Sequence, residues 1–278
     1  MKYLILFLFP FLMSAQTNRF IYEVNYKKDS ADKFITKDYY HLDIAEGNSN
    51  FYNRDYFIMD SIQTSGGDLS PASFGGMPPK MSNVVKHDLK TNKFRELELM
   101  EYEVFDISSE TQQKWNLKNE TKVFQNMTLQ KAETNWGGRK WTAWFAKSIP
   151  FNSGPHKFYG LPGLIVELKD DRDNFHYQLI KSEHYAETKK IQTLDDFPGT
   201  VPVSFAQYKK KMLSLYEDPL AFINTTNFNF ENSEGIFLKD NTLVKPDNVR
   251  KVRKAQQEKI RRINNPVELD KIIVYPIK

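Results

Sequence analysis

The stretch Phe20-Ile21-Tyr22-Glu23-Val24-Asn25-Tyr26 places a large aromatic or aliphatic residue at every second position. Successive side chains of a β-strand point to opposite faces, so every second residue from Phe20 to Tyr26 shares one face. A strand that is buried on one side has this pattern. The stretch therefore predicts a β-strand that lies over an apolar core.

Runs of the same kind follow along most of the chain. They are Phe34–Ala45, Phe51–Ile62, Val84–Leu89, Phe94–Met100, Tyr102–Ile107, Thr121–Trp136, Lys140–Ile149, Leu164–Lys169 and Phe175–His184. No helical pattern separates them, as it would in a chain of β-α-β units, and strands this close together pair antiparallel. We therefore expect a mainly β (α+β) fold, either a curved antiparallel meander sheet or a partly open barrel.

Two helices are predicted near the C-terminus, and we expect both to pack on the sheet. Ser204 can cap the first, which covers about residues 204–216 and ends before Pro219. The second covers about residues 248–263 and has a narrow apolar face. A last apolar run, Ile272–Tyr275, predicts a closing strand.

One long segment interrupts the strand pattern. Thr64–Lys80 contains four Gly and three Pro, which predicts a long loop or flap. Loops of this length are often functional, so this one is a candidate site whose role the sequence does not specify. No repeat or linker divides residues 16–278, and we expect a single β-rich domain that carries the late helices.

The N-terminus has the pattern of a secretory signal peptide. Lys2 is followed by an apolar run and then by Ser14-Ala15 before the polar Gln16. The run is shorter than the roughly 20 apolar residues that span a bilayer. We expect residues 1–15 to be removed, leaving a mature chain without a transmembrane span. This predicts a location in the periplasm or cell envelope, with an extracellular location as the alternative.

Composition excludes several classes of protein. The chain has 278 residues and no Cys, which excludes disulfide frameworks, thiolate catalysis and cysteine-ligated zinc. Hydrophobic residues make up 40% of the chain, with 21 Phe among them, so the chain can bury a substantial core. A wholly disordered protein is therefore excluded.

Positive charge is concentrated in one segment. Lys245–Arg262 holds eight basic residues against two acidic ones, within a formal net charge of +4 for the whole chain. The predicted second helix thus has a basic face made of Arg250, Lys251, Arg253, Lys254, Arg261 and Arg262. Export argues against nucleic acid as a partner. An ordinary solvated helix face and a peripheral contact with an anionic membrane surface or acidic partner both remain open.

The most distinctive stretch lies between Lys131 and Leu168. It contains Arg139-Lys140-Trp141-Thr142-Ala143-Trp144-Phe145, Ile149-Pro150, Gly154-Pro155 and Gly160-Leu161-Pro162-Gly163-Leu164-Ile165. Over about forty residues the chain resembles the GLPGLI family of exported proteins from Gram-negative bacteria, named for this hexapeptide. The resemblance implies export and relatives of similar size. It implies no biochemical activity.

The hexapeptide itself offers no nucleophile, acid or base. Pro162-Gly163 matches the central pair of a type II turn, and the alternation that begins at Leu164 predicts a strand. Two roles remain open for this turn. It sets strand register and core packing, or Gly160, Leu161, Pro162 and Gly163 form a surface on which a partner docks.

The residues before the hexapeptide predict a hairpin. Gly137-Gly138 suits the turns with positive φ that join twisted strands, and it would connect Trp136 to Arg139. Beyond it, Trp141 and Trp144 fall on opposite faces of one strand. Burial of both faces by the core is one interpretation. An aromatic-lined groove for an apolar or peptide ligand, with Trp136, Arg139, Trp141 and Trp144 at its surface, is the other.

The sequence lacks the short motifs of serine hydrolases, zinc proteases and nucleotide-binding proteins. His156 is the best single acid/base candidate, with Glu167 as its possible pair. His41 and Asp43 share a strand face and could provide two ligands of a metal site. Asp170–Asn174 lacks the Gly and Glu of a calcium loop and predicts a charged hairpin. We expect no metal site and no cofactor.

These observations favour a non-enzymatic envelope protein, a binding or interaction module beside an outer-membrane transport or assembly system. One alternative is a periplasmic carrier whose concave sheet, lined by Tyr22, Trp141 and Phe145, holds an apolar or peptide ligand. The other is an envelope hydrolase or metal-dependent enzyme, which requires the candidate polar residues to meet in a cleft. A continuous cavity favours the carrier, and a solid core with an exposed aromatic patch favours the module.

Overall fold

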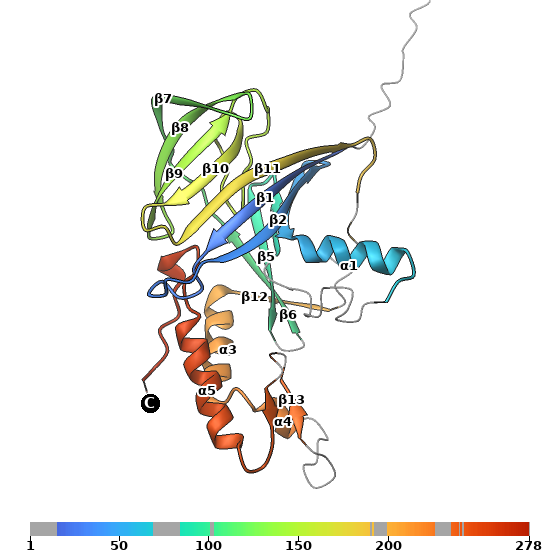
Figure 1. Ribbon diagram of the computed structural model, residues 1–278, viewed down its shortest axis with the longest axis vertical. Helices are drawn as coiled ribbons and strands as arrows, with labels where there is room; N and C mark the ends of the chain where they lie inside the picture. The colour runs from blue at the N-terminus through green and yellow to red at the C-terminus, as the bar shows by residue number, and fades with distance from the viewer. Residues whose placement is uncertain are drawn as a thin grey trace, which may run out of the picture.

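A computed structural model describes residues 16–68, 84–100, 103–189, 191, 199–225, 235–238, 240 and 242–277. Twelve of its strands form one strongly curved sheet, and helices lie against the sheet and below it (Figure 1). The strands of the sheet are β1 (Thr17–Tyr26), β2 (Thr36–Ala45), β3 (Asn48–Asn53), β4 (Val84–Asp88), β5 (Lys93–Met100), β6 (Glu103–Glu110), β7 (Asn116–Phe124), β8 (Met127–Trp136), β9 (Arg139–Ala146), β10 (Leu164–Asp170), β11 (Phe175–Tyr185) and β12 (Thr200–Val203). The mainly β fold is confirmed.

The sheet consists of two antiparallel meanders joined side by side. The strand order is β12-β6-β5-β4-β3-β2-β1-β11-β10-β9-β8-β7, so β1–β6 form one meander and β7–β11 the other. The last strand of the second meander, β11, pairs along the whole of β1. Only β12 runs parallel to its neighbour, β6, among the described strands. The edge strands β12 and β7 do not pair with each other, so the sheet stays open.

The connection between the two meanders explains the curvature. Five residues, Thr111–Trp115, join β6 to β7, and a chain of that length spans at most about 20 Å. In a flat sheet these strands, ten positions apart in the strand order, would be separated by about 48 Å. The sheet must therefore curl until its two ends approach. Hydrogen bonds from Gln113 to the Lys157 carbonyl and from Trp115 to the Tyr159 carbonyl tie this connection to the loop before β10.

The core lies on the concave face of the sheet, as the alternation in β1 predicts. Phe20, Tyr22 and Val24 are buried there. Trp141 and Phe145 of β9 belong to the same core and are completely buried. Val24 lies at the border of this core, where it also lines a cavity, whereas Tyr22, Trp141 and Phe145 line none of the three cavities described.

The hexapeptide adopts a tighter turn than the expected type II turn. The Gly163 amide donates to the Leu161 carbonyl, which closes a three-residue γ-turn around Pro162. The Leu164 amide, which would close a type II turn, donates to the Ile149 carbonyl instead. Pairing with the preceding loop thus takes the donor that the larger turn needs. The expected strand follows at once as β10.

The Gly137-Gly138 hairpin is confirmed. Both residues have positive φ, and Trp136 pairs with Arg139 across the turn. A similar two-residue turn, Gln125-Asn126, divides the expected run Thr121–Trp136 between β7 and β8.

The expected strand Phe51–Ile62 is wrong beyond Asn53. Residues Arg54–Thr64 form helix α1, which lies against the outer face of the sheet (Figure 1). The Asn53 side chain accepts a hydrogen bond from the Asp55 amide and so caps the helix. This cap ends β3, and Tyr56 is then buried against Tyr52 and the other apolar residues of the outer face.

Both late helices are confirmed, as α3 (Phe205–Glu217) and α5 (Val249–Arg262). Ser204 and Gln207 form a capping box at the start of α3. The two helices lie side by side, and Gln257 of α5 donates to carbonyls at the C-terminal end of α3 (Figure 1). Smaller elements complete this region, namely α4 (Phe222–Thr225), β13 (Ile236–Phe237), β14 (Leu243–Val244) and the short 3-10 helix η3 (Leu269–Lys271).

The expected closing strand Ile272–Tyr275 does not form. The segment is extended, but its neighbours are the helices, because Ile273 and Tyr275 pack against Tyr216 of α3. The Ile273 carbonyl accepts its hydrogen bond from the Asn264 side chain. The expected closing strand is therefore wrong, and the segment buries Ile273 and Tyr275 against the helices while Ile272 and Val274 are exposed.

Two expectations fall outside the described residues. The first is the signal peptide, residues 1–15. The second is the greater part of the expected loop Thr64–Lys80, namely residues 69–80. The first residue of that expected loop, Thr64, is the last residue of α1. Within the described parts of the chain, no helix is both long and apolar enough to cross a membrane.

Candidate functional site

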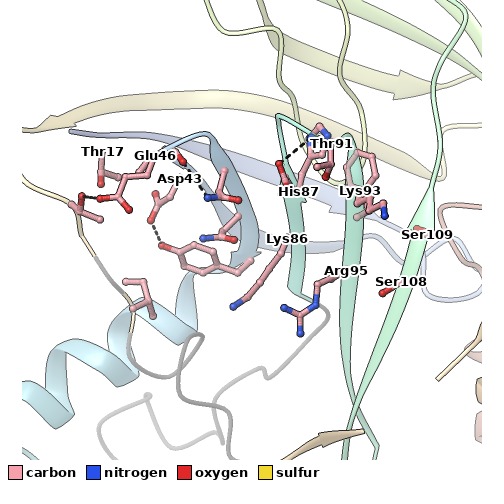
Figure 2. Close-up of a pocket in the computed structure, with 18 of the residues that line it drawn as sticks. Thr17, Asp43, Glu46, Lys86, His87, Thr91, Lys93, Arg95, Ser108 and Ser109 are labelled. Carbon is pink, nitrogen blue, oxygen red and sulfur yellow. Dashed lines mark hydrogen bonds between the residues drawn. The ribbon is translucent and has the colours of Figure 1, made fainter. Parts of the chain in front are cut away.

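Two large cavities flank the sheet, one on each face. The outer-face cavity has a volume of about 1020 Å³ and lies over β2–β6 (Figure 2). The concave-face cavity has a volume of about 490 Å³ and lies between the sheet, α3 and the C-terminal segment, residues 263–275. Both volumes suit a small molecule. The polar groups that line each cavity decide which is the better candidate site.

Several charged groups of the outer-face cavity already have partners, whereas His87 Nε2 and Ser109 Oγ, which also line it, have none in the described structure. Asp43 accepts hydrogen bonds from Arg19 and Tyr52. Arg95 is bound to Asp106. Asp88 accepts from the amides of the tight turn that follows β4. Figure 2 shows that the labelled side chains, Asp43 and Arg95 among them, are spread along the sheet. This cavity offers space without a convergent binding group.

Eight aromatic residues line the concave-face cavity. The aromatic residues that line it are Tyr26, Tyr40, Phe51, Phe175, Tyr177, Phe205, Tyr208 and Tyr275. Two carboxyl groups, those of Glu96 and Glu98, enter it from β5. A mostly apolar cavity with a few polar groups is the usual form of a small-molecule site. We therefore take the concave-face cavity as the candidate functional site.

A buried ion cluster forms one wall of this cavity. The Lys157 ammonium group, which is fully buried, lies 2.5 Å from Glu96 Oε1 and 2.6 Å from Glu268 Oε1. Lys271 lies 3.0 Å from Glu268 Oε2. Burial alone would lower the pKa of Lys157, but the two carboxylates outweigh burial and raise it. Burial likewise opposes the charge on Glu268, and Lys157 and Lys271 hold its pKa below the usual value.

Glu98 is the exceptional group in the cavity. It follows Glu96 by two residues on β5, so both side chains point to the concave face. The ion pairs that the structure describes include none to Glu98. Burial raises its pKa to about 8, and the neighbouring Glu96 carboxylate adds to the shift. The Glu98 carboxyl group is thus largely protonated at neutral pH.

A protonated Glu98 can donate a hydrogen bond, or transfer its proton, to a group in the cavity. General acid/base chemistry would also need a free base nearby. The adjacent Glu96 carboxylate is held by Lys157 and so is not free. The arrangement is therefore better suited to binding than to catalysis.

His156 lines the same cavity but is not an effective base. Burial, and then the charge of Lys157, lower its pKa to about 3. Its Nε2 atom lies 3.9 Å from Glu96 Oε2, and its buried Nδ1 atom has no hydrogen-bond partner in the described structure. The imidazole is therefore neutral over the physiological pH range.

Glu167, the suggested pair of His156, has other partners. It bonds to His176 Nε2 at 3.1 Å and to Lys122. These contacts, led by the His176 hydrogen bond, lower the pKa of Glu167 to about 2. Glu167 is thus an ion-paired residue of β10 and not a member of the cavity.

The residues suggested as a partner surface are divided between core and solvent. Trp141, Leu161 and Gly163 are buried in the core. Gly160 and Pro162 are exposed. Trp136 and Trp144 are half-buried, and Trp144 lies under the Lys122 ammonium group, 4.5 Å from it.

Arg139 holds the C-terminal segment against the sheet. Its buried guanidinium group bonds to Asp170, at 2.9 Å, and to Asn265 and the Pro266 and Val267 carbonyls. Residues 263–268 line the concave-face cavity, so Arg139 fixes the position of one of its walls without lining it.

His41 and Asp43 share a face of β2, as expected, but Asp43 is occupied by Arg19. Burial and the charge of Arg19 lower the pKa of His41 to about 3, and its ring packs between Tyr52 and Phe57. No cluster of three or more residues suited to a metal ion occurs in the described regions.

Most residues of the basic face are exposed on α5, namely Arg250, Lys251, Lys254, Arg261 and Arg262. Arg253 is half-buried and bonds to Asp218 at 2.9 Å. Arg262 lies 3.5 Å from Asp29, in the turn after β1.

Sequence reasoning missed the residues that define the cavity. Glu96 and Glu98 alternate with Leu97 and share the face of Phe94, so acidic residues at core positions of a predicted strand were a usable signal. Lys157 and Glu268 carry no such signal, because they are 111 positions apart and belong to loops.

Comparisons with known proteins agree with the fold and leave the activity open. Residues 97–167, about a quarter of the chain, match a family described as "Protein of unknown function (Porph_ging)". A comparison with curated proteins finds no match.

Two solved structures of PNGF-II, in space groups C2 and P21, are each 14% identical to the chain with a TM-score of 0.51. They match 70% and 71% of this chain, which spans only 32% and 33% of their length. At this identity the likeness is one of fold alone. The chain is thus similar, from β5 to β10, to a bacterial family of unknown function, and similar in fold to about a third of PNGF-II.

Proposed function

We propose that this protein is a non-enzymatic carrier that holds a small ligand in the concave-face cavity. The observation that carries the proposal is the cavity itself, about 490 Å³ of ring-lined space with a single uncompensated carboxyl group. The carrier was expected to use Tyr22, Trp141 and Phe145. Those residues form solid core, and the ligand space lies beside them, toward β2–β6.

The proposal places the protein in the envelope of a Gram-negative bacterium. The signal-peptide pattern of residues 1–15 and the GLPGLI hexapeptide, with the residues before it, support this location. The hexapeptide lies inside the segment that matches the family of unknown function. In this proposal the motif has a structural role, because Leu161, Leu164 and Ile165 are buried.

A second candidate function is an interaction module beside an outer-membrane transport or assembly system. It is supported by the exposed stripe on α5 formed by Arg250, Lys251, Lys254 and Arg261, for which the described structure gives no ion pairs. Such a stripe suits an acidic protein surface or an anionic membrane. The two functions are compatible, since the stripe and the cavity lie on different parts of the molecule.

Native mass spectrometry of the mature protein, purified gently from its own envelope, tests the carrier. We expect a discrete mass above that of the chain from Gln16 to Lys278. A matched pair of variants of α3 locates the adduct, because Met212 lines the cavity and Leu215, on the same helix, does not. Met212→Trp should abolish the adduct and Leu215→Trp should retain it. A bare chain mass for the wild type, or an adduct that survives in Met212→Trp, would count against a ligand in this cavity.

A further inference from the structure

We propose that the concave-face cavity binds small organic cations, a protonated amine joined to an apolar body, with Glu98 as the group that receives the amine. This inference rests on the proposed carrier function and names its ligand class. It is argued from the charges around Glu98, from the rings of the cavity and from the elements that close it.

The charges around the cavity leave Glu98 without a counter-ion. The buried cluster contains two ammonium groups, those of Lys157 and Lys271, and two carboxylates, those of Glu96 and Glu268. These four groups compensate one another. Burial of an additional carboxylate is unfavourable unless a cation accompanies it, so Glu98 stays protonated in the empty cavity. A ligand that brings a positive charge supplies what the site lacks.

The groups that face Glu98 come from several elements. Glu96 on β5 and Lys157 in the loop before β10 act on its charge. The Tyr208 hydroxyl on α3 lies within its field from the side of the cavity, and the Tyr56 hydroxyl on α1 lies within it from the outer face of the sheet. Lys27 and Lys28 line the cavity from the turn after β1, and Lys28 is exposed. Neither of these lysines is among the groups that shift the pKa of Glu98.

The rings of the cavity fit the same class of ligand. Tyr26, Tyr40, Tyr177 and Tyr208 line the same cavity as the carboxyl group, and the Tyr208 hydroxyl lies close enough to feel its charge. The faces of aromatic rings attract cations, most strongly where water is excluded, and they also cover apolar groups. An amine with a short aromatic or aliphatic body would therefore use the carboxyl group and the rings together.

Binding of a cation is expected to release a proton. The ammonium group favours the ionised form of Glu98, so the carboxyl proton passes to the solvent as the ion pair forms. No covalent bond is made or broken in the ligand. Affinity for an amine should rise with pH between about 6 and 8, because removal of the Glu98 proton costs less free energy as the pH approaches the pKa of that group.

Calorimetry of the full mature chain tests this with three probes of similar shape: 2-phenylethylamine, 2-phenylethanol and 3-phenylpropionate. At neutral pH we expect the amine to bind at least about tenfold more tightly than the alcohol, and the carboxylate to bind most weakly. The amine heat should depend on the ionisation enthalpy of the buffer, because a proton is released. In Glu98→Gln the preference for the amine and the buffer dependence should both disappear, while the alcohol binds as before.

The control is Glu110→Gln, which changes an exposed carboxyl group on β6. It should keep the preference for the amine. Equal or tighter binding of the alcohol, or a preference that survives in Glu98→Gln, would overturn the inference. Failure of all three probes to bind also overturns it, and native mass spectrometry then decides separately whether the cavity carries any ligand.

Discussion

Gly163 is the glycine of the hexapeptide at which a side chain would collide with the backbone. Its φ is +147°, and a Cβ atom there would lie 2.2 Å from the Ala146 carbonyl oxygen. Gly160 also has a positive φ, +90°, but a Cβ atom there would meet nothing within 4 Å. Substitution of the two glycines therefore distinguishes two effects. Backbone strain is expected at both positions, and collision with the neighbouring strand is expected only at Gly163.

We predict that Gly163→Ala lowers the free energy of unfolding by at least about 3 kcal/mol, because strain and overpacking add. Gly160→Ala should lower it by about 1–2 kcal/mol, from strain alone. Chemical denaturation of both variants measures the difference. Equal losses would show that the close approach to Ala146 is unimportant.

Glu98 predicts a pH dependence of stability. Its pKa is about 8 in the folded protein, above the unfolded value of 4.5, so the folded state holds the proton more tightly. The folded state is therefore favoured at low pH, and this advantage is lost as pH rises toward 8. The loss is at most about 1.4 kcal/mol per pH unit.

In Glu98→Gln this loss is absent, so the variant should gain stability relative to the wild type between about pH 5 and pH 8. Denaturation at several pH values measures the difference between the two curves. Glu110→Gln, on the neighbouring strand, should run parallel to the wild type. A Glu98→Gln curve that also runs parallel would mean that Glu98 is ionised in the folded protein.

Helix α5 is the element that carries a testable surface. Val252 is buried while Arg250, Lys251, Lys254 and Arg261 are exposed, so the helix presents its charge outward. Each basic residue near an anionic membrane contributes about 1 kcal/mol of binding. Charge on this face is therefore enough for a salt-sensitive, peripheral contact.

We predict that the double variant Lys251→Glu/Lys254→Glu reduces sedimentation with phosphatidylglycerol vesicles at least about tenfold. The matched control, Lys209→Glu/Lys210→Glu, makes the same change of net charge on exposed residues of α3. It should reduce sedimentation much less. Equal reductions would assign the binding to net charge, and no binding by the wild type would leave an acidic protein as the partner to test.

At the scale of the whole molecule, the export expectation makes a definite prediction. Expression of the full chain in a Gram-negative host should yield a periplasmic protein that begins at Gln16. Deletion of residues 2–15 should leave the same folded chain in the cytoplasm, because the first described strand begins at Thr17. Intact mass measurement of the two products checks both points, and an uncleaved chain in the membrane fraction would contradict the expected signal peptide.

Local pattern was enough for most of the elements. The alternation in Phe20–Tyr26 predicts the strand and its buried face, and Ser204 and Gly137-Gly138 predict a helix start and a hairpin, because each feature depends on neighbours in sequence. Helix α1 was missed because a short apolar run such as Phe51–Ile62 fits a strand and a helix equally well. The Asn53 cap is the local signal that distinguishes them.

The site could not be predicted in the same way, because it depends on contacts between distant parts of the chain. The sequence by itself determined that Glu96 and Glu98 lie on one face of a strand, since side chains alternate along a strand. Only the tertiary structure decided that Lys157 pairs with both Glu96 and Glu268 and leaves Glu98 without an ion pair. The protonation of a carboxyl group is set by the burial and charge around it, and those come from loops and helices far away in sequence.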